Sequence, residues 1–181
     1  MLQVWDVRTS ECIQTITPPQ DAHTAELPVM CVRPVPRTAG QIVVVNRSNK
    51  VHILSSSGQV VKTLNAEMGA TKEAKKFKQL EASKAVSSAS DSAKQLKKRN
   101  ERQSQPGVEE GHFTACTVTP RGKWIYALGT DNYMYCFSFA TGNLEHTIHV
   151  SEAMPLGIAH HPVHNLVATY SQENLLRLWK P

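Results

Sequence analysis

The residues in this sequence best suited to metal binding or catalysis are its histidines, which gather most densely at His160, His161 and His164. Histidine is the commonest metal ligand and can act as a general base near neutral pH. However, adjacent side chains of a strand point to opposite faces, and no cysteine or carboxylate joins the group at the spacing of a zinc site. We therefore expect these histidines to pack at a strand end and in the turn around Pro162, and we predict no metal site and no cofactor.

Motifs for nucleophilic catalysis and phosphate binding are missing from the sequence. Ser138, Asp131 and His146 do not form a recognisable nucleophile motif. Neither Gly-x-Ser-x-Gly nor Gly-x-x-x-x-Gly-Lys-Ser/Thr occurs anywhere in the chain. The sequence therefore predicts no enzymatic activity and no catalytic residue.

The cysteines are spread along the chain, at Cys12, Cys31, Cys116 and Cys136. None belongs to a Cys-x-x-Cys pair, and all of them fall in segments that we expect to be strands. This spacing favours reduced core cysteines in an intracellular protein over a disulfide framework or a metal site.

Positive charge is concentrated in one part of the chain. The whole sequence has 20 Lys and Arg against 15 Asp and Glu, and half of the basic residues lie in 66–110. Residues 65–111 are rich in Ala, Ser, Lys, Glu and Gln, which predicts a disordered or partly helical insertion. A basic cluster within it is either a nuclear-localisation or RNA-contacting patch or a solvated spacer of mixed charge. The cluster consists of Lys94, Lys97, Lys98, Arg99 and Arg102.

The remaining chain carries a repeat that must position any functional side chain. Four short segments alternate apolar and variable residues, as half-buried strands do, and each ends in a large apolar anchor: Trp5, Leu54, Phe137 and Trp179. The anchors are separated by 49, 83 and 42 residues. A period of about 40–45 residues is typical of a WD40 blade, which is a four-stranded antiparallel sheet of a β-propeller. The long second interval therefore contains one period and the insertion.

Turn residues repeat along with the anchors. The three later anchor strands are each preceded by a polar turn that ends in asparagine, at Asn49, Asn132 and Asn174. Asparagine tolerates the left-handed backbone conformation that tight hairpins need, so we expect that conformation at these positions. Three coincident turns favour a true repeat over an unrelated β-sandwich, whose strands need no shared anchor.

The predicted fold class is all-β, a partial and open WD40 β-propeller of about three blades. Its strands come in groups of two, four, four and three. The predicted first part is 1–64, with a partial blade at 1–16 and a full blade at 28–64, and the insertion is 65–111. The second part is 112–181, with a full blade at 112–150 and a three-stranded last blade at 154–181. These strands are too few for a closed propeller, so we expect a C-terminal fragment of a larger protein or a truncated gene model. The sequence shows no secretory signal and no apolar run long enough to span a membrane.

Several motifs resemble one particular group of WD40 proteins, the Smu (suppressor-of-mec-and-unc) family. The resemblance covers most of 28–64 and 112–181 and is most specific in the final seventy residues. The motifs that carry it lie at 45–49, 120–126, 135–138, 141–145, 157–162, 165–171 and in the closing Leu-Trp-Lys-Pro.

This resemblance implies a nuclear seven-bladed propeller, also expected in nuclear speckles, that acts in pre-mRNA splicing in the precatalytic spliceosome beside a RED-like partner. It implies only indirect contact with RNA, and it supplies no catalytic residues. In that family an N-terminal helical part with a LisH-type motif carries dimerisation and RED binding. The present sequence has no counterpart of that part, and its 65–111 insertion is longer than the corresponding family loop.

The expected function is that of a non-enzymatic protein-interaction scaffold of the spliceosome. The alternative is a generic WD40 adaptor, such as a ubiquitin-ligase substrate receptor, because fold alone does not decide function. Propeller loops carry recognition, so the candidate partner surface is formed by the polar turns before the anchor strands. It comprises Arg47, Ser48, Thr130, Asp131, Gln172 and Glu173.

Overall fold

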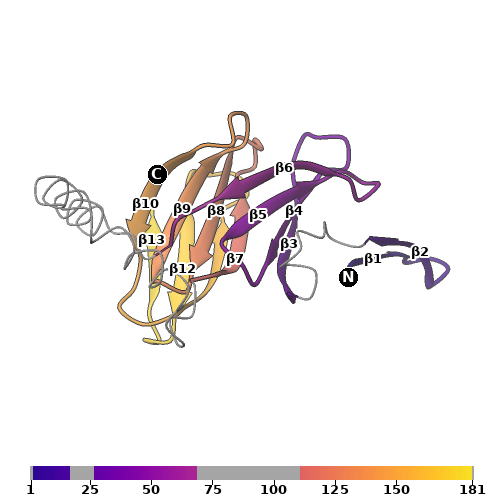
Figure 1. Ribbon diagram of the computed structural model, residues 1–181. Helices are drawn as coiled ribbons and strands as arrows, with labels where there is room; N and C mark the ends of the chain where they lie inside the picture. Colours follow the sequence, from indigo (N-terminus) through magenta and orange to yellow (C-terminus); the bar gives the residue numbers. More distant parts are fainter. Residues whose placement is uncertain (1, 17–26, 69–110, 181) are drawn as a thin grey trace, which may run out of the picture. The chain divides into compact units, whose positions relative to one another are not determined.

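The computed structural model describes residues 2–16, 27–68 and 111–180, and these residues form antiparallel β-strands without any helix (Figure 1). The strands are β1 (Leu2–Asp6), β2 (Glu11–Ile16), β3 (Val29–Pro34), β4 (Ile42–Asn46), β5 (Lys50–Leu54), β6 (Val60–Asn65), β7 (Phe113–Val118), β8 (Trp124–Gly129), β9 (Tyr133–Ser138), β10 (Leu144–His149), β11 (Pro155–His160), β12 (Val167–Ser171) and β13 (Leu176–Trp179).

The described strands form four sheets, each built from strands that follow one another in the chain. Their orders are β1-β2, β3-β4-β5-β6, β7-β8-β9-β10 and β11-β12-β13. The predicted all-β class and the grouping into two, four, four and three strands are therefore confirmed. No helix in the described residues is long and apolar enough to cross a membrane.

The anchors occupy equivalent positions in these sheets, which shows that the sheets are copies of one unit. In three of the sheets the anchor strand follows another strand, and the anchor pairs with an apolar β-branched residue near the start of that preceding strand. The pairs are Leu54 with Ile42, Phe137 with Ile125, and Trp179 with Val167. Trp5 belongs to the same series, because Trp5, Leu54 and Phe137 all lie where the pairing with the following strand shifts by one residue.

A β-bulge near the start of the first strand repeats as well. The pairing of the first two strands shifts after Val29, after Phe113 and after Pro155. A bulge inserts one unpaired residue and increases the local twist of the strand. The same irregularity at the same place in three sheets is a property of the repeat, and the sequence pattern did not reveal it.

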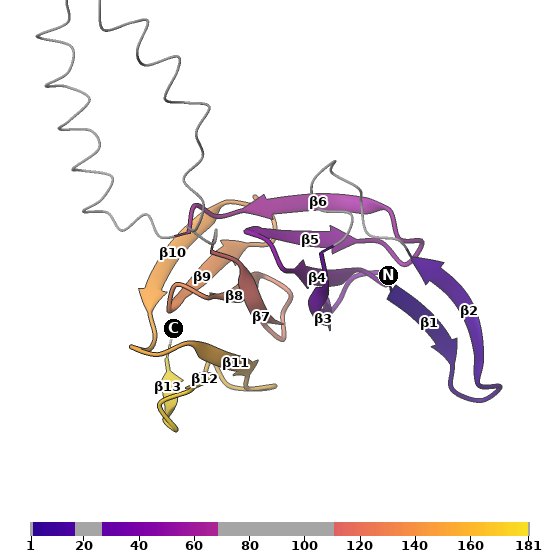
Figure 2. The same cartoon turned by 60° about the horizontal axis from the view of Figure 1, so that its bottom comes forward.

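The largest core cluster lies between the two four-stranded sheets. It includes the completely buried side chains of Val45 and Ile53 from one sheet and of Phe113, Ile125 and Phe137 from the other. Burial of side chains of this size contributes about 1.5–3 kcal/mol each to folding. Strand β7 contacts β3 and β4 of the preceding sheet and β11 of the following one, so the first strands of consecutive sheets meet (Figure 2).

The anchors are equivalent in register but differ in depth. Leu54 and Phe137 are fully buried, whereas Trp179 is partly buried and Trp5 is 54 % exposed. The physical reason is that burial depends on the neighbouring sheet. Leu54 is buried in a cluster with Ile16 of β2, and Phe137 is buried in the cluster between the two four-stranded sheets. Trp179 packs against a cluster that includes residues of the preceding sheet, whereas Trp5 joins none of these clusters.

The start of the insertion also differs from the predicted boundary at residue 65. Asn65 still belongs to β6, Ala66 is buried in the core cluster, and Met68 packs against that cluster. The fold therefore continues through Met68 and resumes at Gly111. The predicted disorder or partial helicity of the insertion falls on 69–110, outside the described residues.

Candidate interaction surface

The six candidate residues lie in three equivalent turns, β4–β5, β8–β9 and β12–β13. Each turn is held by the same backbone hydrogen bond, donated by the amide of its first candidate residue to the segment before the first strand. The three bonds are Arg47 N to Pro28 O at 3.0 Å, Thr130 N to His112 O at 2.9 Å, and Gln172 N to Met154 O at 3.1 Å. The fold thus places the candidates at corresponding ends of three sheets.

The turns are not identical in backbone conformation. Asn132 and Asn174 have positive φ angles of 70° and 59°, which confirms the left-handed conformation expected there. Asn49 does not share it, so this part of the prediction is wrong. In that turn the Ser48 hydroxyl instead donates to Asn46 Oδ1 at 2.6 Å and accepts the amide of Lys50 at 3.1 Å. These side-chain hydrogen bonds stabilise the turn without a left-handed residue.

In the β8–β9 turn, both candidate side chains are engaged within the fold. Thr130 Oγ1 accepts the amide of His112 at 3.1 Å, and an Asp131 carboxylate oxygen accepts the Tyr135 hydroxyl at 2.5 Å. Burial, reinforced by the hydrogen bond to Asp131, raises the pKa of Tyr135 far above its ordinary value, so the tyrosine stays protonated and donates. Thr130 and Asp131 therefore stabilise the turn.

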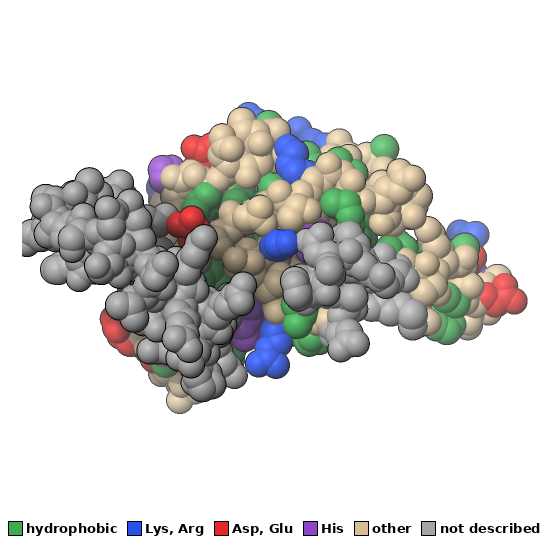
Figure 3. Space-filling view, viewed as in Figure 1, with side chains coloured by type: hydrophobic (Ala, Val, Ile, Leu, Met, Phe, Trp, Pro, Cys, Tyr) green, Lys and Arg blue, Asp and Glu red, His purple; other side chains and the backbone are tan. Residues whose placement is uncertain are grey.

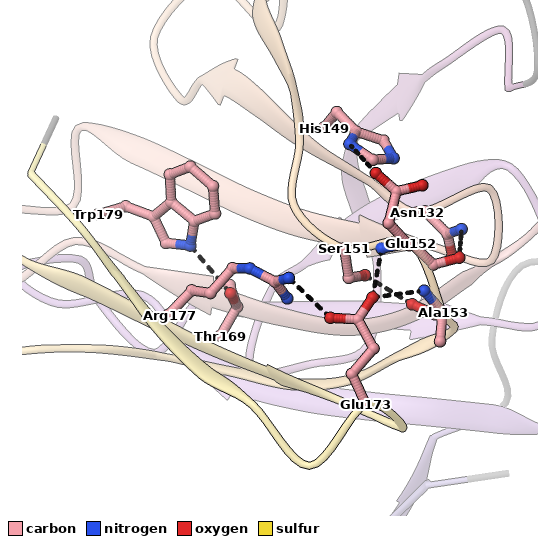
Figure 4. A network of polar contacts seen from close by, with 9 residues as sticks. All are labelled: Asn132, His149, Ser151, Glu152, Ala153, Thr169, Glu173, Arg177 and Trp179. Carbon is pink, nitrogen blue, oxygen red and sulfur yellow. Dashed lines mark hydrogen bonds and ion pairs between the residues drawn. The ribbon is translucent and has the colours of Figure 1, made fainter.

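In the β12–β13 turn, Glu173 is the centre of a polar network (Figure 4). One carboxylate oxygen accepts the amides of Glu152 and Ala153 at 2.5 and 2.8 Å, and the other lies 2.7 Å from Arg177 Nη2. The hydrogen bond from Arg177 and those from the two amides hold the pKa of Glu173 below its ordinary value. Glu173 therefore fixes the link between β10 and β11 to the last turn.

The structure thus divides the candidate surface into two kinds of residue. Ser48, Thr130, Asp131 and Glu173 use their side chains to hold the turns. Arg47 and Gln172 are exposed, and their backbone amides hold the turns, so their side chains face solvent at corresponding places of two sheets. These two are the residues best placed to contact a partner.

The histidine cluster has a structural role in the turn after β11. His161 Nδ1 accepts the amides of Val163 and His164 at 3.1 and 2.9 Å, and His160 Nδ1 lies 2.6 Å from the carbonyl oxygen of His161. The His161 ring therefore holds this turn by accepting backbone amides. No group of three or more His, Cys, Asp or Glu in the described part of the chain is arranged to hold a metal ion.

On the face shown in Figure 3, some Lys and Arg side chains lie at the upper edge and others stand at separate places. A nucleic-acid footprint would need them to cluster on one face. The predicted basic patch of Lys94, Lys97, Lys98, Arg99 and Arg102 lies outside the described residues.

Sequence reasoning missed one relationship among the cysteines. All four are free, but Cys12 is exposed rather than part of the core. Cys31 and Cys116 lie side by side, with 3.6 Å between their sulfur atoms. The sequence could have indicated this contact, because both cysteines fall in the first strand of consecutive repeats and such strands meet in the fold.

Comparison with known proteins agrees with the repeat. No family model matches the sequence. The chain is 24 % identical over 180 residues to the WD40 repeat-containing protein smu1 of Dictyostelium discoideum, an alignment that covers 99 % of this chain and 26 % of the relative. The chain therefore spans about a quarter of the length of that protein.

A solved structure described as the structure of U3-55K superimposes with a TM-score of 0.58. The match covers 86 % of this chain and 36 % of the other, at 11 % identity, and so concerns the fold alone. The repeated antiparallel sheets and this likeness in fold show a WD40-type, β-propeller-like fold, and the alignment along 99 % of the chain shows that the chain is similar to smu1.

Proposed function

We propose that the chain acts in pre-mRNA splicing in the nucleus, as a non-enzymatic scaffold of the precatalytic spliceosome. The observation that carries this proposal is the similarity to smu1, which extends over 99 % of the chain rather than over one blade. The Smu-type motifs lie in the turns and strands that build the repeated sheets, so the similarity includes the framework of the candidate surface.

The proposed contact surface centres on Arg47 and Gln172. Both residues are exposed and stand in turns whose backbones are fixed by hydrogen bonds to the segment before the first strand. A fixed backbone reduces the conformational entropy lost on binding, which favours recognition by these turns. The proposed partners of this surface are other spliceosomal proteins, and contact with RNA is indirect through them.

The test is affinity purification of the tagged chain from nuclear extract, followed by quantitative mass spectrometry. We expect splicing proteins to be enriched over a tag-only control. Arg47→Glu and Gln172→Glu should each lower that enrichment several-fold, because they place negative charge in the proposed surface without removing a side chain that holds a turn.

Arg121→Glu is the matched control. Arg121 is also an exposed arginine in a turn, but its turn joins β7 to β8, at the opposite end of the strands from the candidate surface. This variant should retain the enrichment. Recovery of no splicing proteins would refute the proposal, and recovery of ubiquitin-ligase subunits in their place would favour the adaptor function.

A further inference from the structure

Two cysteines from different sheets lie in direct contact. Cys31 is on β3 and Cys116 on β7, and their sulfur atoms are 3.6 Å apart although the residues are 85 positions apart in sequence. Cys116 is completely buried, whereas Cys31 is only partly buried. Cys31 is therefore the residue of the pair that a small reagent in solvent would reach first, and the Cys116 thiol adjoins it on the buried side.

The surroundings of the pair favour a thiolate on the accessible sulfur. The Cys116 thiol is placed to donate to Cys31 Sγ, and this hydrogen bond is the largest cause that lowers the pKa of Cys31. The nearby positive charge of Arg33 acts in the same direction. The same contact and its burial raise the pKa of Cys116, which stays protonated.

Arg33 also holds the partner strand in place. Its Nε donates to the backbone carbonyl of Cys116 at 3.2 Å, and so ties β3 to β7 beside the two sulfur atoms. The Arg33 side chain is thus fixed beside the two sulfur atoms by a hydrogen bond.

We propose that Cys31 and Cys116 form a peroxide-responsive thiol pair, in which Cys31 is oxidised first and Cys116 then converts it to a disulfide. This combination of an accessible thiolate with a neighbouring resolving thiol is the arrangement expected of a redox-sensitive cysteine.

The chemistry balances with one molecule of a hydroperoxide. The Cys31 thiolate attacks the peroxide oxygen, the O–O bond breaks, and Cys31 becomes a sulfenic acid with release of hydroxide. The Cys116 sulfur then attacks the Cys31 sulfur, the S–S bond forms, and the S–O bond breaks. The leaving hydroxide takes the Cys116 proton and becomes water. The two sulfurs lose two electrons in total, and hydrogen peroxide gains them.

The structural consequence is a covalent link between two sheets that are otherwise joined by packing and hydrogen bonds. The sulfurs must move from 3.6 Å to the bonded distance of about 2.05 Å, a small displacement for two side chains in contact. The link closes a loop that contains β3 to β6 and the 69–110 segment, so it restricts the separation of the two sheets.

The decisive experiment uses the whole wild-type chain. The reduced chain is treated with hydrogen peroxide, remaining thiols are alkylated, and the protein is digested without reduction for mass spectrometry. We expect a cross-linked peptide that joins Cys31 to Cys116, two fewer alkylation sites, and full reversal by dithiothreitol. Alkylation of both residues after peroxide treatment, or a disulfide that instead involves the exposed Cys12, would overturn the proposal.

Variants separate the two roles. In Cys116→Ala, Cys31 should accumulate as a sulfenic acid that dimedone traps, and the disulfide should not form. Cys136→Ala, which also changes a buried cysteine, should leave the Cys31–Cys116 cross-link intact. If Cys116→Ala does not fold, the wild-type peptide map still decides.

The role of Arg33 has its own measurement. The alkylation rate of Cys31 in the reduced chain should reach half its maximum below the ordinary pKa of a cysteine thiol, about 8.5. Arg33→Gln should move this midpoint upward, whereas a purely structural arginine would leave it unchanged in a folded variant.

Discussion

The indole Nε1 of Trp179 donates a hydrogen bond of 2.9 Å to Oγ1 of Thr169 on the neighbouring strand. The positions equivalent to Thr169 in the two four-stranded sheets are Val44 and Ala127. The anchors of those sheets are the apolar residues Leu54 and Phe137. A polar indole is thus matched with a hydroxyl, and an apolar anchor is matched with an apolar residue. The copies of the repeat therefore differ in matched pairs of residues, while the register of their strands stays the same.

Trp179→Phe should destabilise the chain by about 1–2 kcal/mol, because it keeps an aromatic ring but leaves the buried Thr169 hydroxyl without its donor. The free energy of unfolding from urea titration measures the change. Thr169→Val should cost less in the Trp179→Phe background than in the wild type, since the partner has already been removed. Equal costs in both backgrounds would show that the hydrogen bond contributes nothing.

Phe137→Ala should cost about 3–5 kcal/mol, because this fully buried ring leaves a cavity and loses its edge-to-face contact with Phe113. Trp5→Ala, at the equivalent anchor position, should cost no more than about 1 kcal/mol, because over half of the Trp5 surface already meets solvent. Urea titration of both variants tests the difference in depth. Similar losses would contradict the burial described for Trp5.

Gly122→Ala should be more destabilising than Gly142→Ala, although both glycines have positive φ angles, of 68° and 83°. Alanine in this conformation costs about 1–2 kcal/mol at either position. At Gly122 the added Cβ would also lie 2.7 Å from the backbone oxygen of Pro36, whereas at Gly142 it meets the flexible Lys62 side chain at 3.0 Å. Thermal melting of the two variants gives the order, and a reversed order would contradict the close approach of Gly122 to the preceding sheet.

Acidification should remove the stabilisation that Glu173 provides. Its pKa is lowered in the fold, so the ionised carboxylate stabilises the protein above the ordinary value of 4.5, and this contribution is lost as the pH falls through the folded value. Glu173→Gln should therefore melt at a lower temperature than the wild type at pH 7, and the gap should shrink at pH 3.

The exposed Glu11 on β2 provides the control for this measurement, as Glu11→Gln. The melting temperature of Glu11→Gln at pH 7 should equal that of the wild type. A gap for Glu173→Gln that is equally large at both pH values would mean that the network of Arg177, Glu152 and Ala153 does not depend on the charge of Glu173.

The local architecture could be predicted from the sequence alone. Strand positions follow from the alternation of apolar residues and from Pro, Gly and Asn in the turns, and these signals act over a few residues. The anchors at Leu54, Phe137 and Trp179 could be aligned because one unit is repeated, so each copy supports the others. The left-handed conformation of Asn132 and Asn174 follows from the same local reasoning, which fails at Asn49.

Only the tertiary structure decided which residues are buried, which side chains form hydrogen bonds within the fold, and which distant residues are in contact. The exposure of Trp5 depends on the neighbouring sheet, and the engagement of Asp131 and Glu173 depends on partners in other elements. The contact between Cys31 and Cys116 joins residues 85 positions apart, through the packing of the first strands of two sheets. A periodic pattern specifies the face on which a side chain lies, but it carries no information about which distant side chain that face will meet.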